Sequence, residues 1–257
     1  MSVTTLSYWQ RGIRHPGRRE SLRAIAALED LLDLPGKALI QLLEPRDTTG
    51  HPAGRRYSTL VGSGIGDLLA ELEAPQDGGL HTVMQSDTVT IDAHRRLASR
   101  QSQQVLRAHR DGVDRYLVVH IGEHGCAVEC VDVTELVNCR AGRVRRSQEA
   151  GLVAAELLLD ARLRVGETTM VGYRFQDGTG ESSQGFSRAF LFSDSPYALQ
   201  ITFDRAALPV RCRSFTQTSV SMPPTFTADL TLNAHGALHL FEQEAARGLL
   251  GICWDWE

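Results

Sequence analysis

The sequence predicts an α+β protein, with a small N-terminal helical segment followed by a mainly antiparallel β-sandwich domain. Near the N-terminus, apolar residues recur at spacings of three and four, which is typical of a helix with one buried face. From about Leu80 the apolar period changes to two, the period of a half-buried strand. Short apolar runs separated by Gly, Pro, Asn and Asp then recur to the C-terminus, as in a sandwich or barrel.

Residues 1–46 form the first predicted unit, and their pattern is helical. Pro35-Gly36 separates a central helix from a short helix that follows it. Ser21 is a candidate N-cap of the central helix, and a start within residues 18–20 is the alternative. The apolar face of the central helix consists of Leu22, Ile25, Leu28, Leu31 and Leu32, and that of the short helix of Leu39, Leu42 and Leu43.

Residues 47–79 are predicted to be a linker with one short helix. Its first part, residues 47–54, is small, polar and rich in Pro and Gly. A helix is expected over residues 65–73, because Leu68, Leu69 and Leu72 share one side. Pro75 ends this helix.

Residues 80–257 form the predicted β-rich domain, a sandwich with a possible role in sensing or dimerisation. Asp111-Gly112 predicts a hairpin turn. Residues 242–247 are expected to be a wide loop or one helical turn. Strands are expected within 83–91, 105–107, 116–121, 152–159, 168–175, 186–192, 198–203, 210–215, 228–232, 237–241 and 249–254.

The composition is that of an ordinary globular protein, with 257 residues, 42% hydrophobic residues and a net charge of -4. No run of about 18 apolar residues predicts a membrane span, and no export signal is evident, so the sequence predicts a cytoplasmic protein. The five cysteines are an odd number, and we expect reduced thiols.

Basic residues gather in one short segment. From Arg11 to Arg23 there are five arginines against Glu20 alone, although the whole chain is slightly acidic. A positive field confined to one small region is typical of a DNA-binding head on a neutral or acidic body. A solvated helix face followed by a basic turn is the alternative interpretation.

The motif at residues 7–16 carries the most specific information in the chain. It reads S-x-W-x-R-G-x-x-x-P: Gly12 ends a helix, a basic turn follows, and Pro16 closes the turn. With the amphipathic helix behind it, this order resembles the second half of a Cro/C1-type (XRE-like) helix-turn-helix domain, over roughly residues 2–43. The remainder is similar to the β-rich C-terminal part of actinobacterial regulator-like proteins, in residues 110–116, 166–168 and 254–256.

The resemblance implies a DNA-binding transcriptional regulator that acts on double-stranded DNA as a homodimer, with an unknown effector and no membrane contact. Trp9 falls on the family's core aromatic residue. The helix that enters the major groove would present its early polar residues to base edges, and the arginines would contact phosphates. The implied DNA-binding residues are Ser2, Thr4, Thr5, Ser7, Tyr8, Arg11, Arg14, Arg18 and Arg19.

The chain departs from the family at its front. The first two helices of the domain are missing, so the sequence reads as an N-terminally shortened member, and Gln10 stands where the family usually has Glu. Either the start lies upstream in a longer gene, or the remaining helices dock on the β domain or dimerise without binding DNA. The alternative function is therefore a non-enzymatic protein-interaction module whose helical segment mediates assembly.

Enzyme chemistry has the least support in the sequence. The Gly-rich residues 62–67 lack the lysine of a phosphate-binding P-loop, and no G-x-S-x-G nucleophile motif is present. Cys126, Cys130 and Cys139, with His120 and His124 nearby, do not have the C-x2-C spacing of a typical zinc site. We therefore expect no enzyme activity, no cofactor, no metal and no catalytic residue.

Overall fold

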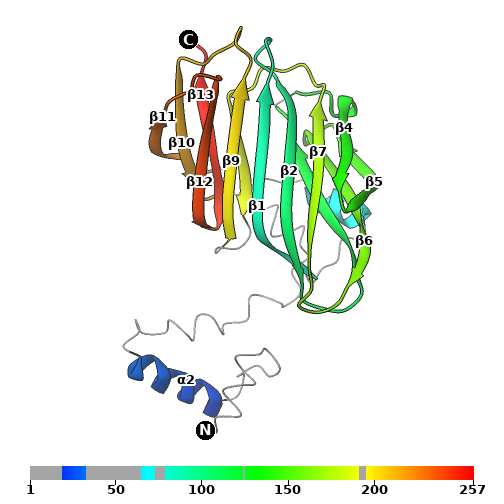
Figure 1. Cartoon of the computed structure of the whole chain (residues 1–257), viewed down its shortest axis with the longest axis vertical. Helices are drawn as coiled ribbons and strands as arrows, with labels where there is room; N and C mark the ends of the chain where they lie inside the picture. Colours follow the sequence, from blue (N-terminus) through cyan, green and yellow to red (C-terminus); the bar gives the residue numbers. More distant parts are fainter. Residues whose placement is uncertain (1–18, 33–64, 73–78, 124, 191–194) are drawn as a thin grey trace. The chain divides into compact units, whose positions relative to one another are not determined.

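The structure is a computed structural model that describes residues 19–32, 65–72, 79–123, 125–190 and 195–257 (Figure 1). The chain divides into two compact units, Met1–His51 and Pro52–Glu257. The described helices are α2 (Arg19–Leu31), α5 (Ile65–Glu71) and the short 3-10 helix η1 (Val128–Cys130). The described strands are β1 (Leu80–Ile91), β2 (Leu97–Ala108), β3 (Val113–Ile121), β4 (Val131–Val137), β5 (Cys139–Ser147), β6 (Leu152–Leu163), β7 (Thr168–Asp177), β8 (Gly185–Phe190), β9 (Ser195–Phe203), β10 (Arg211–Gln217), β11 (Thr225–Leu230), β12 (Ala237–Ala245) and β13 (Gly248–Asp255).

The predicted α+β class is wrong, because the described part of the chain is mainly β. α2 and α5 are the two α-helices within it, and both are short. The spacing of apolar residues correctly located α2 and α5. It could not show that helices form only a small part of the described fold. The other helical predictions fall on residues 1–18 and 33–64, which lie outside the described residues.

The burial of α2 differs from its predicted apolar face. Ile25 is buried as expected, and Leu28 is half-buried. Leu31 and Leu32 were expected on the same buried face, but they are 79% and 59% exposed. Leu31 is the last residue of α2, and Leu32 follows it directly.

Three sheets build the second unit, in two layers. One layer is a six-stranded sheet with the strand order β12-β9-β1-β2-β7-β4 (Figure 1). The facing layer consists of a four-stranded sheet, β11-β10-β13-β8, and a three-stranded sheet, β3-β6-β5. Neighbouring strands run antiparallel except β1 and β9, which are parallel.

Each facing sheet has its own hydrophobic core with the six-stranded sheet. One core joins β2, β7 and β4 to the three-stranded sheet, and it contains Val171, Phe175 and Leu157. The other joins β1, β9 and β12 to the four-stranded sheet, and it contains Ile201 and Trp254. The facing layer therefore changes from one sheet to the other above the middle of the six-stranded sheet.

Four features of the strands differ from the sequence prediction. Asp111-Gly112 does not close a hairpin, because β2 pairs with β1 and β7 whereas β3 pairs with β6. This turn, in which Gly112 has a φ of 78°, instead carries the chain from one layer to the other. The sequence also did not predict β4 or the arginine-rich β5, and β12 continues to Ala245 where a loop or helical turn was expected.

α5 covers the outer face of the three-stranded sheet. Leu68, Leu69 and Leu72 pack with Leu152 and Ala154 of β6, so this end of the unit has a third layer. The burial explains why a helix of seven residues persists, since isolated helices of this length are unstable in water.

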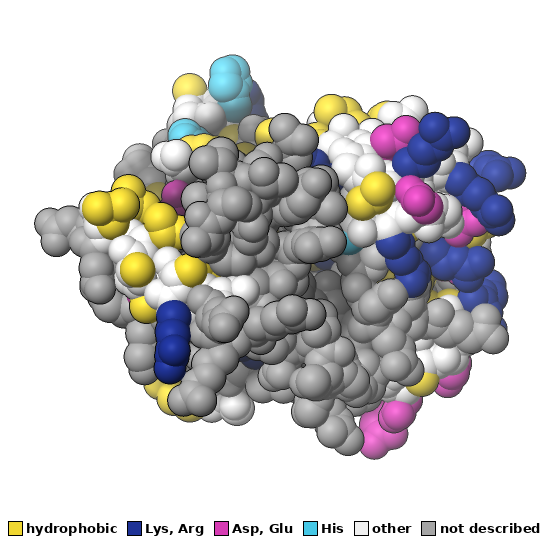
Figure 2. Space-filling model, turned by 90° about the horizontal axis from the view of Figure 1, so that it is seen from below, with side chains coloured by type: hydrophobic (Ala, Val, Ile, Leu, Met, Phe, Trp, Pro, Cys, Tyr) yellow, Lys and Arg dark blue, Asp and Glu magenta, His cyan; other side chains and the backbone are white. Residues whose placement is uncertain are grey.

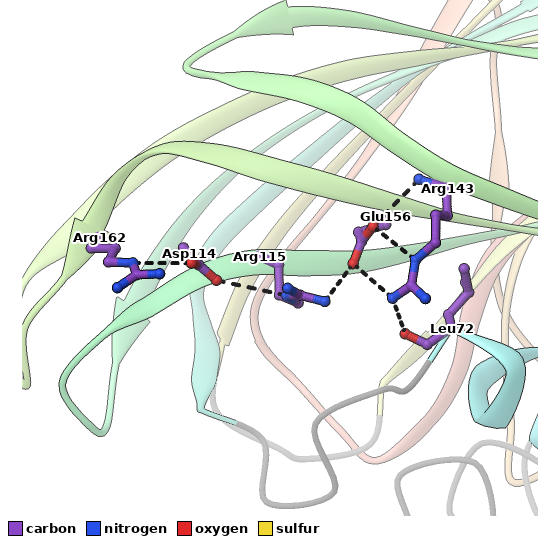
Figure 3. A network of polar contacts seen from close by, with 6 residues as sticks. All are labelled: Leu72, Asp114, Arg115, Arg143, Glu156 and Arg162. Atoms are coloured by element: carbon purple, nitrogen blue, oxygen red, sulfur yellow. Dashed lines mark hydrogen bonds and ion pairs between the residues drawn. The ribbon is translucent and has the colours of Figure 1, made fainter.

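A carboxylate on the same outer face holds the strands and the helix together (Figure 3). The side chain of Glu156 on β6 is 5% exposed and accepts hydrogen bonds from Arg115 of β3 at 2.8 Å and from Arg143 of β5 at 3.3 Å. Arg143 Nη2 also donates to the carbonyl of Leu72 at 2.9 Å, directly after α5. Hydrogen bonding to Arg143 and Arg115 outweighs the effect of burial and lowers the pKa of Glu156.

Figure 2 shows arginine and acidic side chains intermixed on the right-hand side of the view, the side on which Figure 1 draws β5 and β6. Ion pairs account for this mixture. Besides the Glu156 contacts, Arg145 pairs with Glu71 at 3.4 Å and Arg162 with Asp114 at 3.2 Å. Two of the four arginines of β5, Arg143 and Arg145, thus have carboxylate partners in this unit, whereas Arg146 donates to the carbonyls of Val128 and Val131.

We expect Glu156→Ala to lower the free energy of unfolding by about 1–3 kcal/mol, because it removes the carboxylate shared by two arginines that are about a third exposed. Urea denaturation followed by circular dichroism measures the effect. Asp229→Ala is the control, since Asp229 forms an exposed ion pair with Arg211 and should cause almost no change. Equal losses from the two substitutions would contradict the structural role of Glu156.

Candidate ligand site

The predicted DNA-binding residues lie almost entirely outside the described part of the chain. Arg19 begins α2, but its side chain is outside the described part too. The prediction for this set therefore stays a prediction. The residues outside the described ranges are Ser2, Thr4, Thr5, Ser7, Tyr8, Arg11, Arg14 and Arg18.

The described residues hold a different candidate site, inside the β unit. Polar side chains occupy the middle of the inner face of the six-stranded sheet, between the two hydrophobic cores. In the register of β1 and β2, Asp87 lies opposite Ser102 and Gln85 opposite Gln104. We call the following set the polar seam: Gln85, Asp87, Arg100, Ser102, Gln104, Tyr173, Arg188 and Tyr197.

The seam lies where the facing layer is divided. Arg188 reaches into it from β8, the edge strand of the four-stranded sheet. From the other side, the carbonyl of Val119 on β3, an edge strand of the three-stranded sheet, accepts a hydrogen bond from Arg100 Nη2 at 3.1 Å. β3 and β8 are not hydrogen-bonded to each other, so side chains of the seam supply the polar contacts between the sheets at this point.

Asp87 is the centre of the seam, and its side chain has no exposed surface. Its Oδ1 accepts a short hydrogen bond from Ser102 and lies 3.6 Å from Arg188 Nη1. Its Oδ2 accepts hydrogen bonds from Tyr197 at 3.0 Å and from Gln85 at 3.2 Å. A carboxylate offers about four acceptor positions, and four donors or cations from four strands (β1, β2, β8 and β9) surround this one.

Tyr173 is a second point at which the layers meet. Its hydroxyl accepts hydrogen bonds from Gln104 Nε2 at 3.2 Å and from Arg188 Nη2 at 3.4 Å. Burial alone would lower the pKa of Arg188, but the nearby phenol of Tyr173 and the carboxylate of Asp87 outweigh it and raise that pKa well above its ordinary value. Burial and the Asp87 charge together raise the pKa of Tyr197 well above its ordinary value, so its hydroxyl stays protonated and donates.

Arg100 has a different position from Arg188. It is 4% exposed, and its guanidinium carbon lies 4.7 Å from the ring centre of Phe175 and 6.0 Å from that of Tyr173. No carboxylate of the described residues lies within ion-pair distance of it, and its Nε has no hydrogen-bond partner there. Burial lowers the pKa of Arg100, and the surrounding groups only partly offset this effect.

Next to the seam, a histidine and an aspartate join β3 to β7. His120 Nε2 lies 2.9 Å from Asp177 Oδ2, both side chains are almost fully buried, and the imidazole stacks on Phe175 at 5.2 Å. Burial lowers the pKa of His120 in spite of the bond to Asp177. Burial would raise the pKa of Asp177, but hydrogen bonds from His120 and from the backbone N–H of Thr179 lower it overall. The imidazole is therefore neutral at pH 7 and donates its Nε2–H to the carboxylate.

The arrangement is suited to holding a polar group more than to nucleophilic chemistry. Cys126 lies near this pair, but burial raises the pKa of its thiol, which makes it a poor nucleophile. The five cysteines are free, and in the described part of the chain no three His, Cys, Asp or Glu side chains come together as metal ligands. Among the described residues, the buried side-chain atoms without a hydrogen-bond partner include Arg100 Nε, Arg188 Nη1, Gln104 Oε1 and His120 Nδ1.

The polar seam was not predicted from the sequence, although the alternation of β2 contains a signal for it. Leu106 faces the core, and stepping back by two residues places Gln104, Ser102 and Arg100 on the same inward face. Inward-facing polar residues resemble the outward face of a strand, so only the three residues 105–107 were recognised. Asp87 was likewise inside a predicted strand without being assigned to the inner face.

None of the helices in the described residues is long and apolar enough to cross a membrane. No family model matches the sequence, and none of the curated proteins compared with it matches.

The buried His120 should make the fold sensitive to acid. Unfolding frees His120 to bind a proton with an ordinary pKa of about 6.5, whereas the folded protein resists protonation. Its contribution is complete above about pH 6.5 and is lost as the pH falls from there toward the folded pKa, by up to about 1.4 kcal/mol per pH unit. Asp177, whose folded pKa is lowered, adds a further loss below about pH 4.

Urea denaturation between pH 5 and pH 8 measures this dependence. His120→Gln keeps a donor for Asp177 but cannot titrate, so the slope of stability against pH below 6.5 should become shallower. His239→Gln, at an exposed position of β12, is the matched control and should leave the slope unchanged. A slope that is the same in His120→Gln and in the unmodified protein would contradict this assignment.

Proposed function

We propose that the chain is a DNA-binding transcriptional regulator of the XRE-like type, with the N-terminal unit contacting double-stranded DNA. The observation that carries the proposal is the cluster of five arginines from Arg11 to Arg23 on the S-x-W-x-R-G-x-x-x-P motif. Arginine side chains around a helix-turn-helix segment supply the phosphate contacts that dominate affinity for DNA.

Two features of the structure support this proposal. The helix expected directly after the basic turn exists as α2, and Arg23, the last arginine of the cluster, is exposed on it. The chain also divides at His51 into a small N-terminal unit and a large β unit. A separate small unit suits a DNA-contacting head whose activity a second unit controls.

We assign the β unit to effector sensing and to homodimerisation. Its polar seam offers buried, unpartnered hydrogen-bonding atoms, which are characteristic of small-molecule sites. Edge strands β11 and β12 expose Phe226 and Phe241, which are 48% and 63% exposed, and apolar groups on edge strands are suited to contact with a second copy. Dimeric regulators match the two-fold symmetry of their operators.

A specific observation favours the alternative, a protein-interaction module without DNA binding. Leu31 and Leu32 at the end of α2 are largely exposed, and adjacent exposed leucines are a common assembly contact. In this case the N-terminal unit would hold copies of the chain together, and its arginines would be solvated.

The first test is DNA binding by the full chain. Duplexes enriched from a random library are titrated by fluorescence anisotropy at several salt concentrations. Arg11→Ala combined with Arg14→Ala should weaken binding at least tenfold. It should also reduce the steepness of log affinity against log salt by about two, because each phosphate contact releases about one counterion from the DNA and two contacts are removed.

The matched control is Arg205→Ala combined with Arg247→Ala, which removes two exposed arginines of the β unit. Binding and salt slope should stay unchanged in this variant. Absence of a DNA complex at low salt, or an unchanged slope in the Arg11/Arg14 variant, would refute DNA binding through this segment.

The interaction module is tested by measuring molar mass with light scattering on the full chain. Leu31→Glu combined with Leu32→Glu should dissociate the oligomer if α2 mediates assembly, because two charges cannot be buried at an apolar contact. An unchanged oligomer together with salt-dependent DNA binding would support the regulator and reject the alternative.

A further inference from the structure

Arg100 is an arginine that is buried without a counterion among the described residues. Within the described residues its contacts are one hydrogen bond to the carbonyl of Val119 and the faces of two aromatic rings, and Asp87 attracts it only from beyond ion-pair distance. A buried charge is costly unless it is paired and hydrogen-bonded. Cation–π contacts with Phe175 and Tyr173 recover only part of that cost.

Asp87 does not pair with Arg100, because its carboxylate faces other groups. Its Oδ1 accepts from Ser102 and lies 3.6 Å from Arg188 Nη1, which is an ion pair beyond hydrogen-bond length, and its Oδ2 accepts from Tyr197 and Gln85. Arg188 is moreover the residue that lies within ion-pair distance of Asp87, at 3.6 Å. The seam thus contains two guanidinium groups and one carboxylate, which leaves one positive charge without a partner.

The unpartnered donors indicate where a counterion would bind. Arg100 Nε and Arg188 Nη1 are both buried N–H groups without a hydrogen-bond acceptor, and the two guanidinium groups are close enough to repel each other. A carboxylate has two oxygens on a planar group, so it can accept from one arginine with each oxygen.

We propose that the polar seam is a binding site for a small monovalent carboxylate, held between Arg100 and Arg188. The ligand carries one negative charge because the seam has one excess positive charge; a doubly charged phosphate would leave an excess of the opposite sign. This inference deepens the sensing role in the proposed function and rests on that function only for its biological meaning.

The position of the seam explains how the ligand enters. β3 and β8 are edge strands that share no backbone hydrogen bonds, so opening between them breaks no strand pairing. The side chain of Arg188 on β8 is 15% exposed, although its Nη1 is buried, whereas Arg100 is 4% exposed. We therefore expect Arg188 to lie nearer the point of entry than Arg100.

The experiment uses the full chain without DNA and acetate as the probe. Acetate is titrated against chloride at constant ionic strength, with the thermal midpoint and the line width of carbon-13-labelled acetate in NMR as the two readouts. Specific binding should raise the midpoint saturably, by about 3–5 °C at ten times Kd, and should broaden the acetate signal. Equal midpoints in both salts, together with an unbroadened acetate line, would overturn the proposal.

Arg100→Gln tests which residue holds the ligand. The variant should lose at least tenfold in acetate affinity, while its midpoint in chloride should stay equal or rise, because an uncompensated buried charge has been removed. If Arg100 had only a structural role, the opposite result is expected: the variant would have a lower thermal midpoint and would still respond to acetate. Arg188→Gln is the second variant and should also weaken acetate binding, so the proposal remains testable if one variant folds poorly.

Arg213→Gln is the matched control. Arg213 is also partly buried, but it has its own carboxylate in Asp255 at 3.4 Å, so its loss should leave acetate binding unchanged. An acetate response retained in both seam variants would place the anion elsewhere and refute this site. Acetate binding is measured without DNA, and DNA binding is measured in chloride without acetate. The two experiments therefore show separately whether the anion site or the DNA-binding function fails.

Discussion

The contact between Asp87 and Arg188 is the constraint on which the β unit depends. It joins the middle of the six-stranded sheet to the edge of the four-stranded sheet, at the point where the facing layer is divided. Apolar contacts elsewhere in the two cores would tolerate small shifts of one sheet over another. A carboxylate that accepts from Ser102, Tyr197 and Gln85 tolerates none, because each donor needs its own distance and direction.

Such a buried polar cluster stabilises less than an apolar core of the same volume would, since desolvation offsets much of the Coulomb attraction. Its value in this fold lies in specifying one arrangement of three sheets. Arg188 is the inward-facing arginine of β8, and a slip of β8 by one residue would turn it away from Asp87. The Arg100 bond to the carbonyl of Val119 fixes β3 in the same manner from the other side. Polar contacts therefore align the sheets, and the two apolar cores supply most of the stability.

The sequence predicted the parts of this fold that repeat with a clear apolar period, and it could not predict the parts that depend on which sheet a strand joins. Period-two alternation located most strands. It also places Trp254 and Trp256 near the C-terminus on one face, where both indoles donate to the carbonyl of Ser183. The same alternation could not show that β2 and β3 belong to different layers, because a turn such as Asp111-Gly112 suits a hairpin equally well. It also failed where inward positions are polar, as in residues 100–104 of β2, and where a strand is rich in arginine, as in β5.

Glu156 shows why the missing counterion matters at one arginine and not at another. It also faces two arginines with a single carboxylate, the same ratio as in the seam. The side chains of Arg115 and Arg143, however, are 37% and 36% exposed, so water solvates the charge that Glu156 does not neutralise. Arg100 has 4% of its surface exposed and cannot be solvated in this way. Identical charge ratios thus have different consequences: on the outer face the excess charge is a surface property, and in the seam it requires an anion from outside the described residues.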